Sequence, residues 1–175
     1  MSRTTDHLVL VGLMASGKSE VGRRVAERLG RSLLDSDVEI ARTTGRTVRE
    51  LAAEIGPDAM HDLEERQLLD ALARREPVVV AAAASTIERE ACRDALRAEG
   101  VFVVWLRVPV PLLVARFHSA GHRPTFDRPV DELLADQMAR RGPLFEQVAD
   151  VRMQVDAGAT PDALATALLW ALEDA

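Results

Sequence analysis

The chain has 175 residues, of which 47% are hydrophobic, and it carries a formal net charge of −6 at pH 7. This length suits one domain with a buried core rather than two, and the negative charge argues against broad contacts with nucleic acid or acidic membranes. Cys92 is the only cysteine, the N-terminus lacks the apolar run of a signal peptide, and no apolar stretch reaches the roughly 18 residues of a membrane span. We therefore expect a cytoplasmic protein whose partners are small molecules.

The first predicted elements enclose the most specific motif in the chain. An apolar run at residues 8–11 indicates a strand, and the periodicity of residues 19–29 indicates a helix that ends before Gly30. Between them, residues 12–19 read GLMASGKS and match the pattern G-x-x-x-x-G-K-[ST] in the strand-to-helix setting that it requires. Such a loop surrounds phosphates with backbone amides and a helix N-terminus, so the sequence predicts ATP or GTP binding.

Individual residues of this loop have predicted roles. Lys18 should reach the β- and γ-phosphates, and the Ser19 hydroxyl should hold Mg²⁺, which prefers oxygen ligands. The nucleotide-binding residues predicted in this segment are Gly12, Ala15, Ser16, Gly17, Lys18, Ser19 and Glu20. The loop alone does not decide whether the phosphoryl group passes to water, to a protein or to a metabolite.

Two carboxylates follow the second predicted strand, a weaker apolar run at residues 32–34. Asp35 and Asp37 should emerge at the carboxyl edge of the sheet, where open α/β folds bind their ligands. One carboxylate can position hydrated Mg²⁺, and the other can orient an attacking hydroxyl and accept its proton. Asp37 also precedes a predicted helix that begins at Val38, so a helix cap is an equally good interpretation of this residue.

The rest of the chain continues the alternation of strands and helices. Helical periodicity covers residues 58–75, 88–99 and 131–148, strong apolar runs lie at residues 78–82 and 101–106, and a weaker strand fits residues 151–155. Thr160 and Pro161 suit the start of a C-terminal helix. This order predicts a three-layer α/β/α sandwich with a central five-stranded parallel sheet. The irregular stretch at residues 119–129 fits a mobile lid and a surface loop equally well.

Several segments together resemble one known family. They are GLMASGKSEVGRRVAERLG, LLDSDVEIARTTGRTVREL, DLEERQLLDAL, HRP at residues 122–124 and RRGPLFEQVADVRMQVD. In these segments the chain resembles the shikimate kinases of aromatic amino-acid biosynthesis, which have the nucleoside-monophosphate-kinase-like P-loop fold. The resemblance implies a single, monomeric kinase domain over residues 1–175 with a lid at about 117–129. It also implies that ATP and Mg²⁺ serve to phosphorylate a hydroxyl of shikimate or a related polyhydroxylated compound.

The resemblance implies roles for individual residues as well. Asp35 matches an aspartate near the metal, and Asp37 matches the aspartate that binds the substrate hydroxyls and serves as base. Arg123 resembles the lid arginine that closes over ATP and stabilises the migrating phosphoryl group, and Arg116 resembles an arginine that stacks on adenine. Arg141 resembles an arginine that holds the substrate's carboxylate. The predicted catalytic residues are Lys18, Asp37 and Arg123.

Two positions on the acceptor side depart from the family pattern. Shikimate kinases carry a second carboxylate-binding arginine at the position of His61 and three glycines at residues 82–84, which are alanines here. Histidine offers one well-placed donor instead of a bidentate fork, which lowers carboxylate affinity on the order of ten- to a hundredfold. Alanine adds methyl groups and disfavours positive φ. We therefore predict an altered, more apolar acceptor pocket whose contacts include Asp37, His61, Ala83 and Arg141.

The same departures leave other interpretations open. His61 could be a surface residue of its helix, and the alanines could extend a buried strand. Glu20 stands where the family has threonine and places a negative charge near the phosphates unless its side chain turns to solvent, while Thr125 and Phe126 replace lid leucines. The alternatives to a shikimate kinase are a kinase of a polyol or cyclitol and a nucleotide-binding module that has lost the transfer reaction. A nucleoside monophosphate kinase ranks below them, because few arginines could bind an acceptor phosphate.

Overall fold

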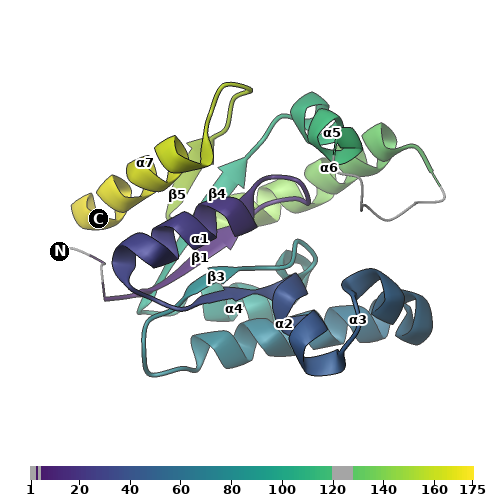
Figure 1. The fold of residues 1–175 in the computed structure, drawn as a ribbon, viewed down its shortest axis with the longest axis horizontal. Coiled ribbons are helices and arrows are strands. Elements are labelled where there is room, and N and C mark those ends of the chain that lie inside the picture. The colour runs from purple at the N-terminus through teal and green to yellow at the C-terminus, as the bar shows by residue number, and fades with distance from the viewer. Residues whose placement is uncertain (1–2, 4, 120–127) are drawn as a thin grey trace.

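A parallel sheet of five strands forms the centre of the molecule (Figure 1). The computed structural model describes residues 3, 5–119 and 128–175. The strands are β1 (His7–Val11), β2 (Leu33–Asp35), β3 (Val79–Ala81), β4 (Val101–Arg107) and β5 (Val151–Gln154). They lie in the order β2-β3-β1-β4-β5, and every neighbouring pair is parallel. The predicted sheet is confirmed, and β1, which carries the phosphate-loop motif at its end, lies in its middle.

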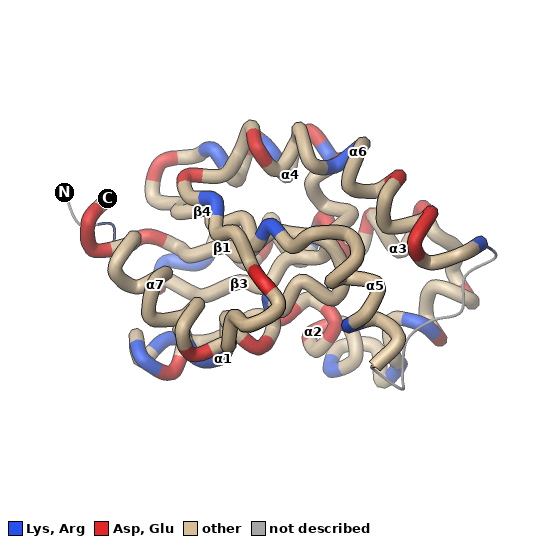
Figure 2. The backbone as a smooth tube through the Cα atoms, turned by 90° about the horizontal axis from the view of Figure 1, so that it is seen from above, with Lys and Arg blue, Asp and Glu red and all other residues tan. Residues whose placement is uncertain are grey.

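Helices cover both faces of this sheet. They are α1 (Lys18–Leu29), α2 (Ser36–Thr44), α3 (Val48–Leu72), the 3-10 turn η1 (Thr86–Glu88), α4 (Glu90–Leu96), α5 (Val110–Ser119), α6 (Val130–Val148) and α7 (Pro161–Asp174). Seen from above in Figure 2, α1 and α7 lie on one side of the strands, and α4 and α6 lie on the other. This is the predicted three-layer sandwich, and it explains why the central strands lack polar alternation.

The helix predicted at residues 58–75 is the second part of a longer element. Thr47 and Glu50 form a capping box at the start of α3, eight residues before Gly56 departs from helical geometry with φ 81° and ψ 167°. Pro57 follows directly and begins the second part. The sequence-based prediction missed the first part of α3, because this part is short and ends at the break at Gly56. The predicted start of α7 is confirmed, since the Thr160 side chain accepts a hydrogen bond from the backbone N–H of Ala163.

Two separate hydrophobic clusters support these layers. The larger one contains the sheet and the helices packed on it, and Leu8, Val9 and Leu10 of β1 are fully buried within it. The smaller one, which we call the α2–α3 cluster, consists of buried Ile40, Leu51 and Met60 with three partly buried neighbours. The first part of α3 therefore packs mainly against α2 and not against the centre of the sheet.

Within residues 3, 5–119 and 128–175, no helix combines the length and the apolar character that crossing a bilayer needs.

Candidate active site

The loop between β1 and α1 has the geometry that the motif predicts. A side chain at Gly12 (φ 146°) would place its Cβ 2.9 Å from the carbonyl oxygen of Leu106, so only glycine fits the close approach to β4. Gly17 (φ 97°) immediately precedes the first residue of α1. Ala15 has φ 64°, an uncommon value for a residue with a Cβ, and such local strain is concentrated at ligand-binding loops. The loop thus bends tightly around the N-terminus of α1, which suits the phosphates of a nucleotide.

Two cationic side chains reach this loop from different helices. The ammonium of Lys18, in α1, donates hydrogen bonds of 2.9 Å to the carbonyl oxygens of Gly12 and Leu13. Arg116, in α5, donates through Nη1 to the carbonyl oxygen of Ser16 at 3.3 Å. The predicted metal ligand Ser19 lies exposed in the first turn of α1. Positive charge and helix N-terminus therefore coincide at one place, where a polyphosphate with its Mg²⁺ would fit.

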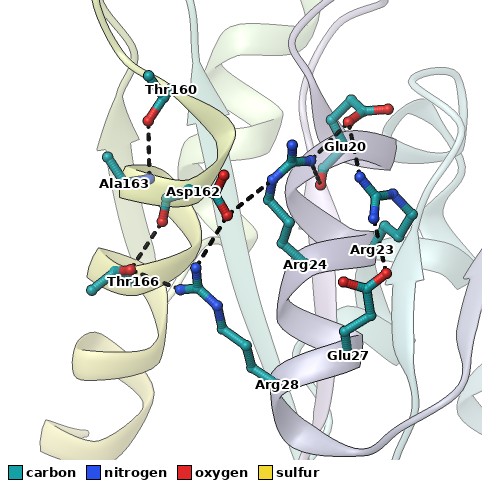
Figure 3. A network of polar contacts seen from close by, with 9 residues as sticks. All are labelled: Glu20, Arg23, Arg24, Glu27, Arg28, Thr160, Asp162, Ala163 and Thr166. Atoms are coloured by element: carbon teal, nitrogen blue, oxygen red, sulfur yellow. Dashed lines mark hydrogen bonds and ion pairs between the residues drawn. The ribbon is translucent and has the colours of Figure 1, made fainter.

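The negative charge of Glu20 is directed along the flank of α1. Its carboxylate pairs with Arg24 at 2.8 Å and with Arg23 at 3.5 Å, as Figure 3 shows. The hydrogen bond from Arg24 is the main reason why the pKa of Glu20 lies below its ordinary value. Arg24 and Arg28 both contact Asp162 of α7, so the network continues to the neighbouring helix. The backbone N–H of Glu20 can therefore bind a nucleotide while the charge of its side chain stays away from the phosphates.

Asp35 and Asp37 differ in their structural roles: Asp35 caps the helix, and Asp37 does not. The Asp35 carboxylate caps α2 by accepting hydrogen bonds from the N–H of Asp37 at 3.1 Å and of Val38 at 3.4 Å. The interpretation of Asp37 as the cap is wrong, because β2 extends to Asp35 and α2 begins directly at Ser36. Asp37 is instead an exposed residue in the first turn of α2. The helix end thus holds Asp35 in place, buried at 8% exposure, and presents Asp37 at the sheet edge.

Glu64, which the sequence-based analysis missed, lies near the residues that the sequence assigns to the acceptor. It is only 8% exposed on α3, and its carboxylate accepts a hydrogen bond from the Ser85 hydroxyl. Burial raises the pKa of Glu64, and the negative charge of Asp37 acts in the same direction. The Ser85 hydrogen bond and the charges of His61 and Arg141 act against this rise. Asp37, His61 and Arg141, which the sequence assigns to the acceptor, thus all act electrostatically on Glu64.

Arg141 is buried on α6 and belongs to an ion-pair group that the sequence did not predict. Its Nη2 donates to one carboxylate oxygen of Glu88 at 2.9 Å, while Nη1 of Arg140 donates to the other oxygen at the same distance. Partial burial acts to raise the pKa of Glu88, but the hydrogen bond and charge of Arg141 lead the opposing effects and hold it below its ordinary value. Arg140 and His61 contribute to this lowering.

The alanine segment borders an open cavity. Strand β3 ends at Ala81, and Ala82 and Ala83 line a cavity of about 200 Å³ between α2 and α3, together with Ser36 and Glu64. Asp37, His61 and Arg141 are not among its lining residues. The predicted acceptor residues therefore do not all face one cavity: Ala83 and Glu64 border the space toward α2, and the charged group lies beside it.

One predicted catalytic residue is outside the described part of the chain. Arg123 and the lid residues Thr125 and Phe126 fall within residues 120–127, whose structure is not described. The flanking elements are described: α5 ends at Ser119, and Arg128 pairs with Asp136 of α6 at 3.0 Å. The role assigned to Arg123 stays a prediction from the sequence.

Comparisons with known proteins agree with this geometry. The family model for shikimate kinase matches residues 14–173. A shikimate kinase of Nitratidesulfovibrio vulgaris is 40% identical over 153 residues, covering 85% of this chain and 86% of the relative. Shikimate kinase 1 of Yersinia pestis is 34% identical over 152 residues, covering 86% of this chain and 87% of the relative. The solved shikimate kinase from Acinetobacter baumannii in complex with shikimate has a TM-score of 0.87 and 32% identity, with 98% of this chain and 96% of that chain covered.

Proposed function

The chain belongs to the shikimate kinase family of phosphotransferases, and on that premise we propose that it transfers the γ-phosphoryl group of ATP to a hydroxyl of shikimate or a closely related polyhydroxylated compound. The proposal rests on where the nucleotide-binding loop and the proposed base lie relative to each other. The phosphate-binding loop, with Lys18 and Arg116, follows β1, and Asp37 follows β2 at the same carboxyl edge of the sheet. Donor and acceptor can therefore meet at one edge.

The residues then divide the reaction as follows. Lys18 and the loop amides hold the β- and γ-phosphates, and Arg116 flanks the nucleotide. Asp37 orients the acceptor hydroxyl and takes its proton, which it can do only from a position beside the loop. Ser19 and Asp35 are the residues that would hold Mg²⁺, which supplies charge neutralisation at the phosphates when bound. For Arg123, which is outside the described residues, we keep the role predicted from the sequence, which is to close over the donor and limit the access of water.

The acceptor is the part of the proposal that needs a direct experiment. We would measure ADP formation by the purified protein with ATP and Mg²⁺ in the presence of shikimate, quinate, gluconate, cyclitols or nucleoside monophosphates, and with no acceptor. Turnover that depends on shikimate or a similar ring supports the proposal. Tight ATP binding without turnover on any acceptor would identify the chain as a nucleotide-binding module instead.

A kinase for an uncharged polyol or cyclitol is the second candidate. One observation favours it: the position of the second carboxylate-binding arginine is occupied by His61, and Arg141 is already paired with Glu88. In the same acceptor panel, turnover with cyclitols but not with shikimate would select this function.

The cellular setting completes the proposal. We place the enzyme in the cytoplasm as a monomer that binds neither nucleic acid nor membranes. The support is the small-molecule chemistry of the site together with the net charge of −6. Light scattering coupled to size exclusion tests the monomer, because a mass near twice 19.1 kDa would contradict it.

A further inference from the structure

The ion pairs around Arg141 carry an inference about the class of acceptor. Arg141 is the one arginine among the buried polar residues of the described chain, at 7% exposure. Its guanidinium contacts Glu88, whose other oxygen contacts Arg140, so one protein carboxylate is shared between two arginines. Glu88 lies in η1, on a segment directly after the alanines of the predicted acceptor pocket. A protein carboxylate is therefore already bound to the arginine that, by the family resemblance, holds the carboxylate of the substrate.

The contact with Glu88 places a negative charge beside any second carboxylate that approaches Arg141. A guanidinium has two edges that can bind a carboxylate with two parallel hydrogen bonds, and Nη2 belongs to both of them. In this protein Nη2 donates to Glu88. Nε, on one of these edges, is buried and has no hydrogen-bond partner among the described residues. An acceptor carboxylate could bind the second N–H of Nη2, but it would then lie beside the carboxylate of Glu88 and be repelled by it, whereas an uncharged hydroxyl would not.

The balance of charge points in the same direction. Asp37, Glu64 and Glu88 supply carboxylates around this site: the charge of Asp37 acts on Glu64, and the charges of Arg141 and His61 act on both Glu64 and Glu88. His61 replaces what would be a fixed positive charge in the family pattern. An anionic acceptor would add a further negative charge to this group, at a cost that an uncharged acceptor avoids.

We infer that Glu88 is a specificity-determining residue that pairs with Arg141 in place of an acceptor carboxylate, so that the site favours an uncharged polyhydroxylated ring. This inference rests on the proposed kinase function and narrows its substrate class. On this inference, Glu88 opposes the binding of an acceptor carboxylate to Arg141. The alternative is that Glu88 positions Arg141 to bind that carboxylate. The two roles predict opposite changes when the charge of Glu88 is removed.

The experiment compares shikimate with its uncharged methyl ester in the wild type and in Glu88→Gln. We expect the wild type to use the ester at least as well as shikimate. Glu88→Gln should raise kcat/KM for shikimate about tenfold, mainly through KM, because the repulsion between the two carboxylates is removed. The kcat/KM for the ester should stay within about twofold, since the ester does not compete for a charge. Glu88→Asp keeps the charge and should retain the wild-type preference.

Glu90→Gln is the matched control, because it removes the same charge two residues further on, at an exposed position of α4. A fall in kcat/KM for shikimate in Glu88→Gln would overturn the inference and assign Glu88 a positioning role. Equal changes for shikimate and ester, or equal effects of Glu88→Gln and Glu90→Gln, would also overturn it.

Calorimetric binding of shikimate separates this inference from the proposed function. If neither protein turns over any acceptor but Glu88→Gln binds shikimate more tightly than the wild type, the kinase proposal fails and the role of Glu88 is supported. If shikimate binding is unchanged or weaker, the role of Glu88 is overturned whether or not turnover occurs. Thermal unfolding of each variant, with and without ATP, establishes that the fold and the donor side are intact.

Discussion

The nucleotide side and the acceptor side of this site share one edge of the sheet but use different parts of the chain. On the nucleotide side, the backbone of one continuous loop provides the shape, through Gly12, Ala15 and Gly17. On the acceptor side, side chains from α2, α3, η1 and α6 provide a group of charges, with Glu64 and Arg141 buried at its centre. A site made of backbone in one loop is constrained by the fold, whereas a site made of separate side chains can change by single substitutions.

Asp37→Asn should produce the largest effect, and it should be confined to the acceptor side. Loss of a general base lowers the rate on the order of 10²–10⁴-fold, while the KM for ATP should change little because the loop is untouched. Steady-state kinetics with both substrates varied measure the two effects separately. Unchanged turnover in Asp37→Asn would remove Asp37 from the role of base.

Lys18→Met should affect the nucleotide side and leave the acceptor side unchanged, the opposite of Asp37→Asn. Removing this cation should lower kcat/KM for ATP by roughly 10²–10³-fold with every acceptor alike. Lys18 is also the only lysine in the chain, so an amine-reactive reagent has this side chain and the N-terminus as its targets. Peptide mapping should show that ATP protects Lys18 from the reagent, and labelling at equal rates with and without ATP would contradict its contact with the phosphates.

His61→Arg should change the acceptor side by a smaller amount. An arginine can offer a charge-assisted contact to the acceptor carboxylate, which is worth about tenfold in the KM for shikimate and leaves the methyl ester unaffected. Ala53→Arg adds the same charge at an exposed position of α3 and serves as control. If both variants lowered the KM for shikimate equally, the effect would be one of general charge, and His61 would not face the acceptor.

Glu64→Gln should give the smallest effect, a change in how stability depends on pH. The pKa of Glu64 is raised above its ordinary value of 4.5, so the folded protein holds a proton that the unfolded chain releases. The free energy of unfolding therefore falls as the pH rises from 4.5 through the raised pKa, and glutamine abolishes this fall. Between pH 4 and pH 8, the melting temperature of Glu64→Gln should rise relative to that of the wild type as the pH increases. A constant difference would mean that Glu64 has an ordinary pKa.

The sequence was sufficient for the strands and the phosphate-binding loop because their signals are local. The apolar run of β1, the spacing of Gly12, Gly17 and Lys18, and the cap at Thr160 each lie within a few residues. The start of α2 could not be placed to the residue, since the same polar segment could end a strand or cap a helix. This ambiguity is the reason that a cap and a function were equally good interpretations of Asp37 and that Asp35 was not considered as the cap.

The acceptor side depended on contacts that no local pattern specifies. Glu88 meets Arg141 across 53 residues of sequence, and Ser85 meets Glu64 across 21. A weaker signal for Glu64 was present, because it lies four residues after Met60 and four before Leu68, both of which are buried on α3. A glutamate on the apolar face of a helix indicates a buried carboxylate with a function or a partner.

The α2–α3 cluster of Ile40, Leu51 and Met60 has a consequence for motion. Because it is small and separate from the cluster that holds the sheet, α2 and the first part of α3 can loosen without unfolding the strands beneath them. Amide hydrogens in α2 should therefore exchange with solvent through local opening, at a lower free energy than those of β1, whose exchange requires global unfolding. Since Asp37, the proposed base, belongs to α2, we expect the acceptor to enter and leave by local opening of α2 while the nucleotide loop stays ordered.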